Sequence, residues 1–297
     1  MSGIVECVPN VSEGRRMDVI DGLASVISAT PGVRLLDRTS DPDHNRSVFT
    51  FAGEAEAVER AALALIDATF KVIDMRGHAG EHPRLGAVDV VPFVPLAGAT
   101  MEECVAIAHR VGAAVAAKHA VPVFYYARAA SRPERVRLPD IRKPQYEGLA
   151  EVLETTHVPD AGPRTLHPTA GAVVIGARPP LIAFNIELDT EDLKLAQRIA
   201  KEIRESSGGL PAVQAKGFML TDPPRAQVSM NLLDHTVTSL PTVWREVASR
   251  AAAAGVRILR GELIGLIPLD AALAAAGDAL QLEAFVRDRV IEARFLE

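Results

Sequence analysis

The second half of the chain carries six segments whose apolar patterns alternate between strand and helix in a fixed order. Two stretches with helical periodicity are each flanked by short apolar runs, which gives strand–helix–strand–strand–helix–strand. This is a split βαβ order, in which both helices pack on one face of an antiparallel sheet. The expected strands are residues 181–188, 212–220, 226–233 and 256–260, and the expected helices are residues 190–205, capped by Thr190, and 240–254.

The first half repeats this order through its second helix. The expected elements are a strand at 4–8, a helix that Ser12 caps and that ends near 29, strands at 33–36 and 47–51, and a helix at 54–73. The two halves match in element order rather than in residue identity. We therefore expect an α+β protein of two ferredoxin-like (split βαβ) subdomains in tandem, residues 1–178 and 179–297, with the boundary near 176–180.

Composition favours a globular protein and argues against one that wraps a polyanion. Of the 297 residues, 48% are hydrophobic and 24% are charged, and the net charge is −6. We expect no nucleic-acid partner. The first residues lack the basic start of a signal peptide, and no apolar run reaches the ~18 residues of a membrane helix, so we expect no membrane association. Cys7 and Cys104 lie in apolar runs and are interpreted as buried free thiols, which favours the cytoplasm.

Residues 75–86 hold the densest group of titratable side chains in the sequence. Two histidines, one glutamate and two arginines lie within nine positions, beside three glycines and a proline. Gly77 and Gly80 weaken a helix, and Pro83 disfavours helical geometry at His82. An irregular loop rich in titratable groups is typical of a functional site, although a surface loop with solvated charges also fits the residues.

The same loop matches H-x-x-E-H, the spacing of an inverted zinc-peptidase motif, from His78 to His82. That motif requires a helix that places both histidines on one face. The glycines and Pro83 break such a helix, and no third ligand follows in a helical context. We therefore expect no metal, and metal analysis of the purified protein would separate the two readings.

Seven stretches of the chain form a recognisable set: VECVPNVSEG from Val5, NRSV from Asn45, GEHPR from Gly80, GAVDV from Gly86, AFNI from Ala183, QVSMNL from Gln227 and GLIPL from Gly265. In order and across essentially the whole chain, they resemble the formiminotransferase family. The resemblance is to the stand-alone transferase, not to the longer formiminotransferase–cyclodeaminase of animals. It implies an N-terminal subdomain at 1–178, a C-terminal subdomain at 179–297 and a homodimer.

The resemblance implies transfer of the formimino group from N-formimino-L-glutamate to N5 of tetrahydrofolate, with release of L-glutamate, in histidine degradation and one-carbon metabolism. His82 maps onto the family's catalytic histidine, and its ordinary pKa suits a group that accepts the N5 proton and then protonates the leaving amine. Arg46 and Arg84 are candidates to hold the donor carboxylates through bidentate pairs. Asn10 is a candidate hydrogen-bonding residue. From the residues alone, Arg46 also fits an exposed strand-start charge and Asn10 an Asx turn.

The family's folate-binding loop maps onto residues 162–171, so tetrahydrofolate is the expected co-substrate. Animal members carry tryptophan where Ala170 stands, so a pterin contact made by that indole is missing here. The basic stretch at 128–143 is interpreted as a solvated loop, with contact to a polyglutamate tail as the alternative. The residues of the folate loop are Gly162, Pro163, Arg164, Thr165, Leu166, His167, Pro168, Thr169, Ala170 and Gly171.

Two other functions remain compatible with the sequence. One is a related folate activity, such as glutamate formyltransfer or the handling of 5-formyltetrahydrofolate. The other is a non-catalytic folate-binding paralogue, which the intact motif around His82 argues against and which Ala170 keeps open. Glu81 and Asp89 are candidates to orient His82, whereas Asp89 fits a strand-end cap equally well. The role of His78 is also open.

Overall fold

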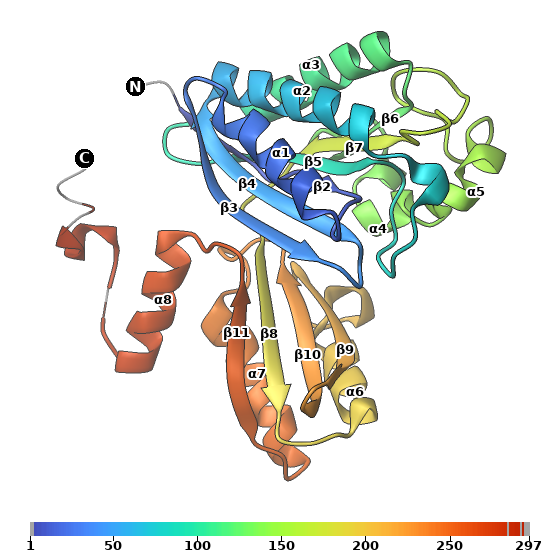
Figure 1. Ribbon diagram of the computed structural model, residues 1–297. Helices are drawn as coiled ribbons and strands as arrows, with labels where there is room; N and C mark the ends of the chain where they lie inside the picture. The colour runs from blue at the N-terminus through green and yellow to red at the C-terminus, as the bar shows by residue number, and fades with distance from the viewer. Residues whose placement is uncertain (1–2, 284, 292, 294–297) are drawn as a thin grey trace. The chain divides into compact units, whose positions relative to one another are not determined.

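The computed structural model describes residues 3–283, 285–291 and 293, and the chain divides into two compact units between residues 178 and 179 (Figure 1). Unit 1 is residues 1–178 and unit 2 is residues 179–297. Each unit has its own sheet and its own buried apolar cluster. None of the helices in these described ranges combines the length and the apolar character that crossing a bilayer requires.

Unit 2 is a four-stranded antiparallel sheet with two helices packed on it, in the order that the sequence predicts. The strands lie in the order β11-β8-β10-β9, and Ile199 and Val243 from the two helices are buried with Val228 of β10. The α+β class and the split βαβ order are therefore confirmed. The elements are β8 (Ile182–Leu188), α6 (Leu193–Ile203), η3 (Glu205–Ser207), β9 (Val213–Thr221), β10 (Pro224–Leu232), α7 (Leu240–Ala253) and β11 (Ile258–Ile264), followed by α8 (Leu269–Leu280) and η4 (Arg287–Arg289).

The expected Thr190 cap of α6 is wrong. Asp192 caps the helix instead, because its Oδ1 accepts hydrogen bonds from the backbone N–H groups of Lys194 at 2.9 Å and Leu195 at 3.2 Å. Thr190 lies one step earlier, and its hydroxyl oxygen accepts from the N–H of Asp192. A carboxylate that satisfies two free amides is the stronger N-cap.

Unit 1 contains the same four-strand order. β1 pairs antiparallel with β4 and β5, and β4 pairs with β3, so β3-β4-β1-β5 corresponds to β9-β10-β8-β11 of unit 2. β5 is the fourth strand that the sequence pattern leaves unassigned. The elements are β1 (Ile4–Cys7), β2 (Asn10–Val11), α1 (Met17–Ser28), β3 (Val33–Asp41), β4 (Arg46–Glu54), α2 (Ala55–Val72), η1 (Met75–Gly77) and β5 (Val88–Pro95).

Two further strands extend this sheet, so the expectation of an antiparallel sheet with helices on one face is wrong for unit 1. β7 pairs in parallel with both β5 and β6. Parallel strands need crossover connections, and they are usually covered on both faces. α1, α2 and α3 pack on one face (Figure 1), and residues of α4 and α5 pack with Phe124 and Val174 on the other. The added elements are α3 (Met101–His119), β6 (Val123–Ala127), η2 (Pro133–Arg135), α4 (Leu138–Ile141), α5 (Gln145–Val152) and β7 (Val173–Ala177).

The basic stretch at residues 128–143 is solvated only in part, contrary to the reading from its composition. Arg135 is 2% exposed. Its guanidinium lies 4.8 Å from the centre of the Phe124 ring, and its Nη2 donates to the carbonyl of Val158 at 3.1 Å. Stacking on an aromatic face allows this cation to be buried, and a count of charges in the sequence cannot reveal it.

The expected Ser12 cap of the first helix is also wrong. α1 begins at Met17, and the Ser12 hydroxyl donates to the carbonyl of Gly86 at 2.8 Å. Glu13 accepts the N–H groups of the two residues before the helix through its Oε1, at 2.9 Å each. The Ser12 contact therefore joins the segment before α1 to the loop before β5.

Replacing Leu149 of α5 with alanine should lower the free energy of unfolding by about 2–5 kcal/mol, because this side chain is fully buried on the second face of the sheet. The matched control is Leu36→Ala on β3, where the side chain is 42% exposed. That change should alter the free energy by less than about 0.5 kcal/mol. Denaturant unfolding followed by circular dichroism measures both, and equally small effects would show that α5 does not pack on the sheet.

Candidate active site

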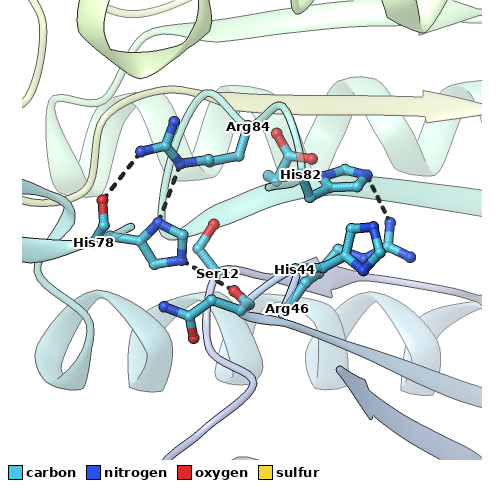
Figure 2. Close-up of a pocket in the computed structure, with 8 residues that line it drawn as sticks. Ser12, His44, Arg46, His78, His82 and Arg84 are labelled. Carbon is cyan, nitrogen blue, oxygen red and sulfur yellow. Dashed lines mark hydrogen bonds between the residues drawn. The ribbon is translucent and has the colours of Figure 1, made fainter. Parts of the chain in front are cut away.

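A narrow pocket in unit 1 is lined by eight residues from three segments and the start of two strands (Figure 2). The segments are the stretch between β2 and α1, the turn between β3 and β4, and the loop between α2 and β5. The lining side chains pack so closely that no space for even a water-sized molecule remains between them, so in this form the pocket does not hold a substrate. The lining residues are Ser12, His44, Asn45, Arg46, His78, His82, Arg84 and Asp89.

Asn45 ties the three segments together. It has a φ of 48°, in the left-handed region that asparagine tolerates better than most residues. Its Oδ1 accepts the N–H of Gly14 at 2.9 Å, and its Nδ2 donates to the carbonyl of Ala79 at 3.0 Å. The next residue, Arg46, is thereby aimed into the pocket.

Arg46 contacts both Asn10 and His82, and Figure 2 shows the contact with His82. Its Nη1 donates to Asn10 Oδ1 and lies 2.9 Å from His82 Nε2, each contact being 2.9 Å. Because a guanidinium can only donate, His82 Nε2 accepts this bond and the neutral ring carries its proton on Nδ1. That Nδ1 is buried and has no hydrogen-bond partner among the described residues.

His82 is held in its neutral form. Burial, followed by the positive charges of Arg46 and Arg142 and by His44, lowers the pKa of His82 to about 2. A neutral imidazole can accept a proton, as a general base must. Here, however, the accepting lone pair on Nε2 is already engaged by Arg46.

Two of the three arginines around the pocket have carboxylate partners. Arg84, 6% exposed, makes a bidentate pair with Glu147, with Nη1 at 2.9 Å and Nη2 at 2.6 Å from its oxygens. Arg142 pairs with Asp89. Among the described residues, Arg46 hydrogen-bonds only to the neutral groups of Asn10 and His82. Among the described residues the site therefore carries a partly buried cation, Arg46, with which no carboxylate pairs directly.

His78 is oriented entirely by protein groups. Its Nδ1 accepts from Arg84 Nε at 3.1 Å, and its Nε2 lies 3.0 Å from the carbonyl of Asn45, to which it donates. Both ring nitrogens are thus occupied, which leaves neither available to a metal in this geometry. Within the described part of the chain, no three His, Cys, Asp or Glu side chains gather as a metal site would require.

Residues 162–171 lie against the loop that carries His82 but do not line the pocket. Backbone hydrogen bonds join Met75 to Thr169 at 2.8 Å and Ala87 to Ala170 at 2.9 Å. Ala170 is fully buried in the main core of unit 1, so its side chain is not presented to a ligand. This loop therefore contacts the loop that carries His82 through its backbone and does not line the pocket itself.

The structure places His82, Arg46 and Arg84 on one pocket, and Asn10 is hydrogen-bonded to Arg46 beside it; their roles in binding and catalysis stay predictions. The sequence reading missed Asn45, His44, Glu147 and Arg142. Asn45 stands beside Arg46 in a stretch that was already singled out, so that signal was present. Glu147 pairs with Arg84 from 63 residues away, and Arg142 pairs with Asp89 from 53 residues away. No local sequence pattern points to either pair.

Comparison with known proteins now decides the family. The model of the formiminotransferase domain, N-terminal subdomain, matches residues 4–178, and that of the formiminotransferase domain matches residues 183–287. The chain belongs to the formiminotransferase family. The resemblance read from the sequence is therefore confirmed. In this formiminotransferase, six of the eight pocket residues fall in the resembling stretches, namely Ser12, Asn45, Arg46, His82, Arg84 and Asp89.

Relatives in the family match over most of the chain. The formiminotransferase is 46% identical over 286 residues to glutamate formimidoyltransferase of Streptococcus pyogenes serotype M1, covering 96% of each chain. It is 42% identical over 292 residues to glutamate formimidoyltransferase of Thermoplasma acidophilum, covering 97% of this chain and 96% of the relative. It is 46% identical over 283 residues to formimidoyltransferase-cyclodeaminase of Rattus norvegicus, covering 93% of this chain and 52% of the relative. The chain thus spans about half the length of that longer relative.

Gly86→Ala should disturb the active-site loop, because an added Cβ would lie 2.2 Å from the carbonyl oxygen of Ala172 and 2.4 Å from that of Ala170. The two backbones must separate, and we expect a loss of about 1–3 kcal/mol in the free energy of unfolding. The matched control in the same loop is Gly77→Ala, where an added Cβ meets nothing within 4 Å. Thermal and urea unfolding compare the variants, and an undisturbed Gly86→Ala protein would contradict the close approach.

The pKa of His82 should make stability depend on pH below about 6.5. The unfolded ring titrates near 6.5, whereas the folded ring stays neutral down to about 2. Between these values the unfolded state binds more protons, so the free energy of unfolding falls as the pH falls, by up to about 1.4 kcal/mol per pH unit. Above 6.5 this contribution is absent. Urea unfolding at pH 7.5 and 5.5 measures this change. The free energy of unfolding should fall less between these two pH values in His82→Gln than in the natural chain, and an equal fall in both would refute the prediction.

Proposed function

We propose that this formiminotransferase moves the formimino group of N-formimino-L-glutamate to N5 of tetrahydrofolate and releases L-glutamate. The observation that carries the proposal is the 46% identity to glutamate formimidoyltransferase of Streptococcus pyogenes over 96% of both chains. The grouping of His82 and Arg46 in one pocket, with Asn10 hydrogen-bonded to Arg46, supports it. A cyclodeaminase activity is not included, because the chain covers only 52% of the relative that bears that name.

The reaction needs a proton acceptor and then a proton donor at one place. The N5 amine of tetrahydrofolate attacks the amidine carbon of the donor, forming a C–N bond and a proton to be removed. The bond from that carbon to the glutamate nitrogen then breaks, and this nitrogen leaves as an amine after it accepts a proton. One imidazole serves both steps, so we assign His82 as the acid–base group.

Arg46 is the stronger candidate for a donor carboxylate. It is largely buried, and burial, with the nearby charge of Arg142, lowers its pKa, which is the mark of a cation held without adequate compensation. A substrate carboxylate would supply the missing anion. Arg84 stays a prediction as a second carboxylate contact, where a substrate would compete with Glu147 for the same guanidinium.

Tetrahydrofolate is the proposed co-substrate, and residues 162–171 are the proposed folate-binding loop. The loop is pinned next to the catalytic loop by backbone hydrogen bonds, which supports a folate that approaches His82 along this side. Arg164 and Thr165 are exposed there, whereas Ala170 is buried. The exposed residues rather than position 170 are therefore the proposed contacts in this chain.

We also propose that the protein works as a homodimer in the cytoplasm, as the family resemblance implies. The buried, unpaired thiols of Cys7 and Cys104 fit a reducing compartment. The dimer rests on the resemblance alone. Sedimentation of the purified protein measures it directly.

The function is tested by offering tetrahydrofolate with N-formiminoglutamate or N-formylglutamate in parallel. Release of glutamate with the formimino donor is the expected result, and turnover of the formyl donor alone would support the related folate activity instead. His82→Ala should lower kcat by about 10²–10⁴-fold while folate affinity is retained, because the ring moves protons and the folate loop makes separate contacts.

The control for this variant is His119→Ala, which removes a histidine of α3 that pairs with Asp67 outside the pocket. It should keep kcat unchanged. Lost folate binding in His82→Ala would make His82 a ligand contact rather than an acid–base group. Near-normal kcat in that variant would remove the proposed mechanism, and folate binding without turnover in the natural chain would indicate a non-catalytic paralogue.

A further inference from the structure

Arg46 blocks the ring nitrogen through which His82 would accept a proton. The Nη1 of Arg46 lies 2.9 Å from His82 Nε2, and its only other hydrogen bond among the described residues is to Asn10. The Nε and Nη2 groups of Arg46 have no protein acceptor in the described part of the chain. These two donors form an open fork of the kind that binds a carboxylate.

The groups that face His82 from the surrounding elements are mostly cationic. Arg46 comes from the start of β4, His44 from the turn before it with its ring centre 6.1 Å away, and Arg142 from the residues after α4. The nearby carboxylates are already engaged: Asp89 of β5 by the N–H of Leu85 and by Arg142, and Asp41 by His44. The backbone of Pro83 favours a proton on the ring, but burial and the cations outweigh it and lower the pKa of His82.

Building on the proposed function, we propose that a carboxylate of the glutamate donor releases His82 by binding the open fork of Arg46. The carboxylate neutralises the guanidinium and draws it away from the ring, so that Nε2 becomes free to accept the N5 proton. The donor thus activates the base that acts on the co-substrate. Without a donor, the pocket holds a histidine that is present but unable to work as a base.

This arrangement makes Arg46 a specificity-determining residue as well as a binding one. In this proposal the donor carboxylate contributes to proton transfer as well as to substrate binding. A donor that lacks the carboxylate loses both contributions. Its kcat should therefore fall, in addition to any rise in KM. A residue that only bound the carboxylate would change KM with little effect on kcat.

The direct test follows the His82 ring by nitrogen-15 NMR of histidine-labelled protein, with the signal assigned from the His82→Ala variant. In the natural chain without ligand, the ring should be neutral with Nδ1 protonated from pH 8 down to pH 5. Saturating L-glutamate, the product that carries the same carboxylates, should raise the pKa of His82 by about 1–3 pH units because it neutralises the cation beside the ring, and the titration is continued down to about pH 3 so that this rise is seen.

Two variants separate the proposed release of His82 by a carboxylate bound to Arg46 from a general effect of charge. Arg46→Met removes the cation and its hydrogen bond, so the pKa of His82 should rise without ligand and glutamate should add nothing. Arg46→Lys keeps the charge and removes the fork, so the pKa should stay low and respond weakly. The control is Lys143→Met, which removes the same charge from a side chain that is 71% exposed beside Arg142, and it should leave the ring and the glutamate response unchanged.

The outcomes are distinguishable from those of the transfer assay. If glutamate binds, as calorimetry measures, and the His82 signal does not move, the proposed release of His82 is overturned while the transferase function stands. If glutamate does not bind, or if Arg46→Met leaves the pKa of His82 unchanged, the assignment of Arg46 is overturned. Circular dichroism shows that each variant is folded before the comparison is made.

Discussion

The buried carboxylate of Asp89 is the interaction on which the candidate site depends most. It is 1% exposed, and a charge in that position is tolerated only when its oxygens are bonded. One oxygen accepts the N–H of Leu85 at 2.9 Å, which fixes the end of the loop that carries His82. The other pairs with Arg142, which brings the segment after α4 onto the sheet. A single charge thereby joins the start of β5, the catalytic loop and the added elements of unit 1.

The regular half of the fold could be read from the sequence because its elements have clean periodicity. In unit 2 the helix residues Leu195 and Ile199 recur at helical spacing and are buried where that spacing places them. β5 reads VDVVPFVP and is buried along nearly its whole length. A strand covered on both faces shows no alternation, so its register and neighbours cannot be derived locally. The predicted cap at Thr190 is wrong because Asp192 caps α6 instead, and the one at Ser12 is wrong because α1 begins later and the Ser12 hydroxyl donates to Gly86.

The site was partly predictable for a different reason. His82, Arg46, Arg84 and Asn10 were found through stretches that resemble a family, and the geometry then brought them together. What each arginine does could not be read in that way, because it depends on which carboxylate the fold delivers to it. Glu147 reaches Arg84 across 63 residues, whereas no carboxylate of the described residues pairs with Arg46. Leaving a partly buried cation uncompensated lowers stability, and active sites commonly accept such a loss in exchange for activity.

The backbone contacts between the catalytic loop and the segment before β7 also bear on how the protein folds. Met75 and Thr169 are hydrogen-bonded but stand about 90 residues apart in sequence, a separation that slows the formation of such contacts. β5 likewise cannot pair with its parallel neighbour β7 until β7 has been synthesised. During synthesis at about 5–20 residues per second, the loop bearing His82 would therefore remain without these partners for about 5–20 s. The arrangement of the loop that carries His82 is therefore among the last features of unit 1 to form, well after its first helices have been made.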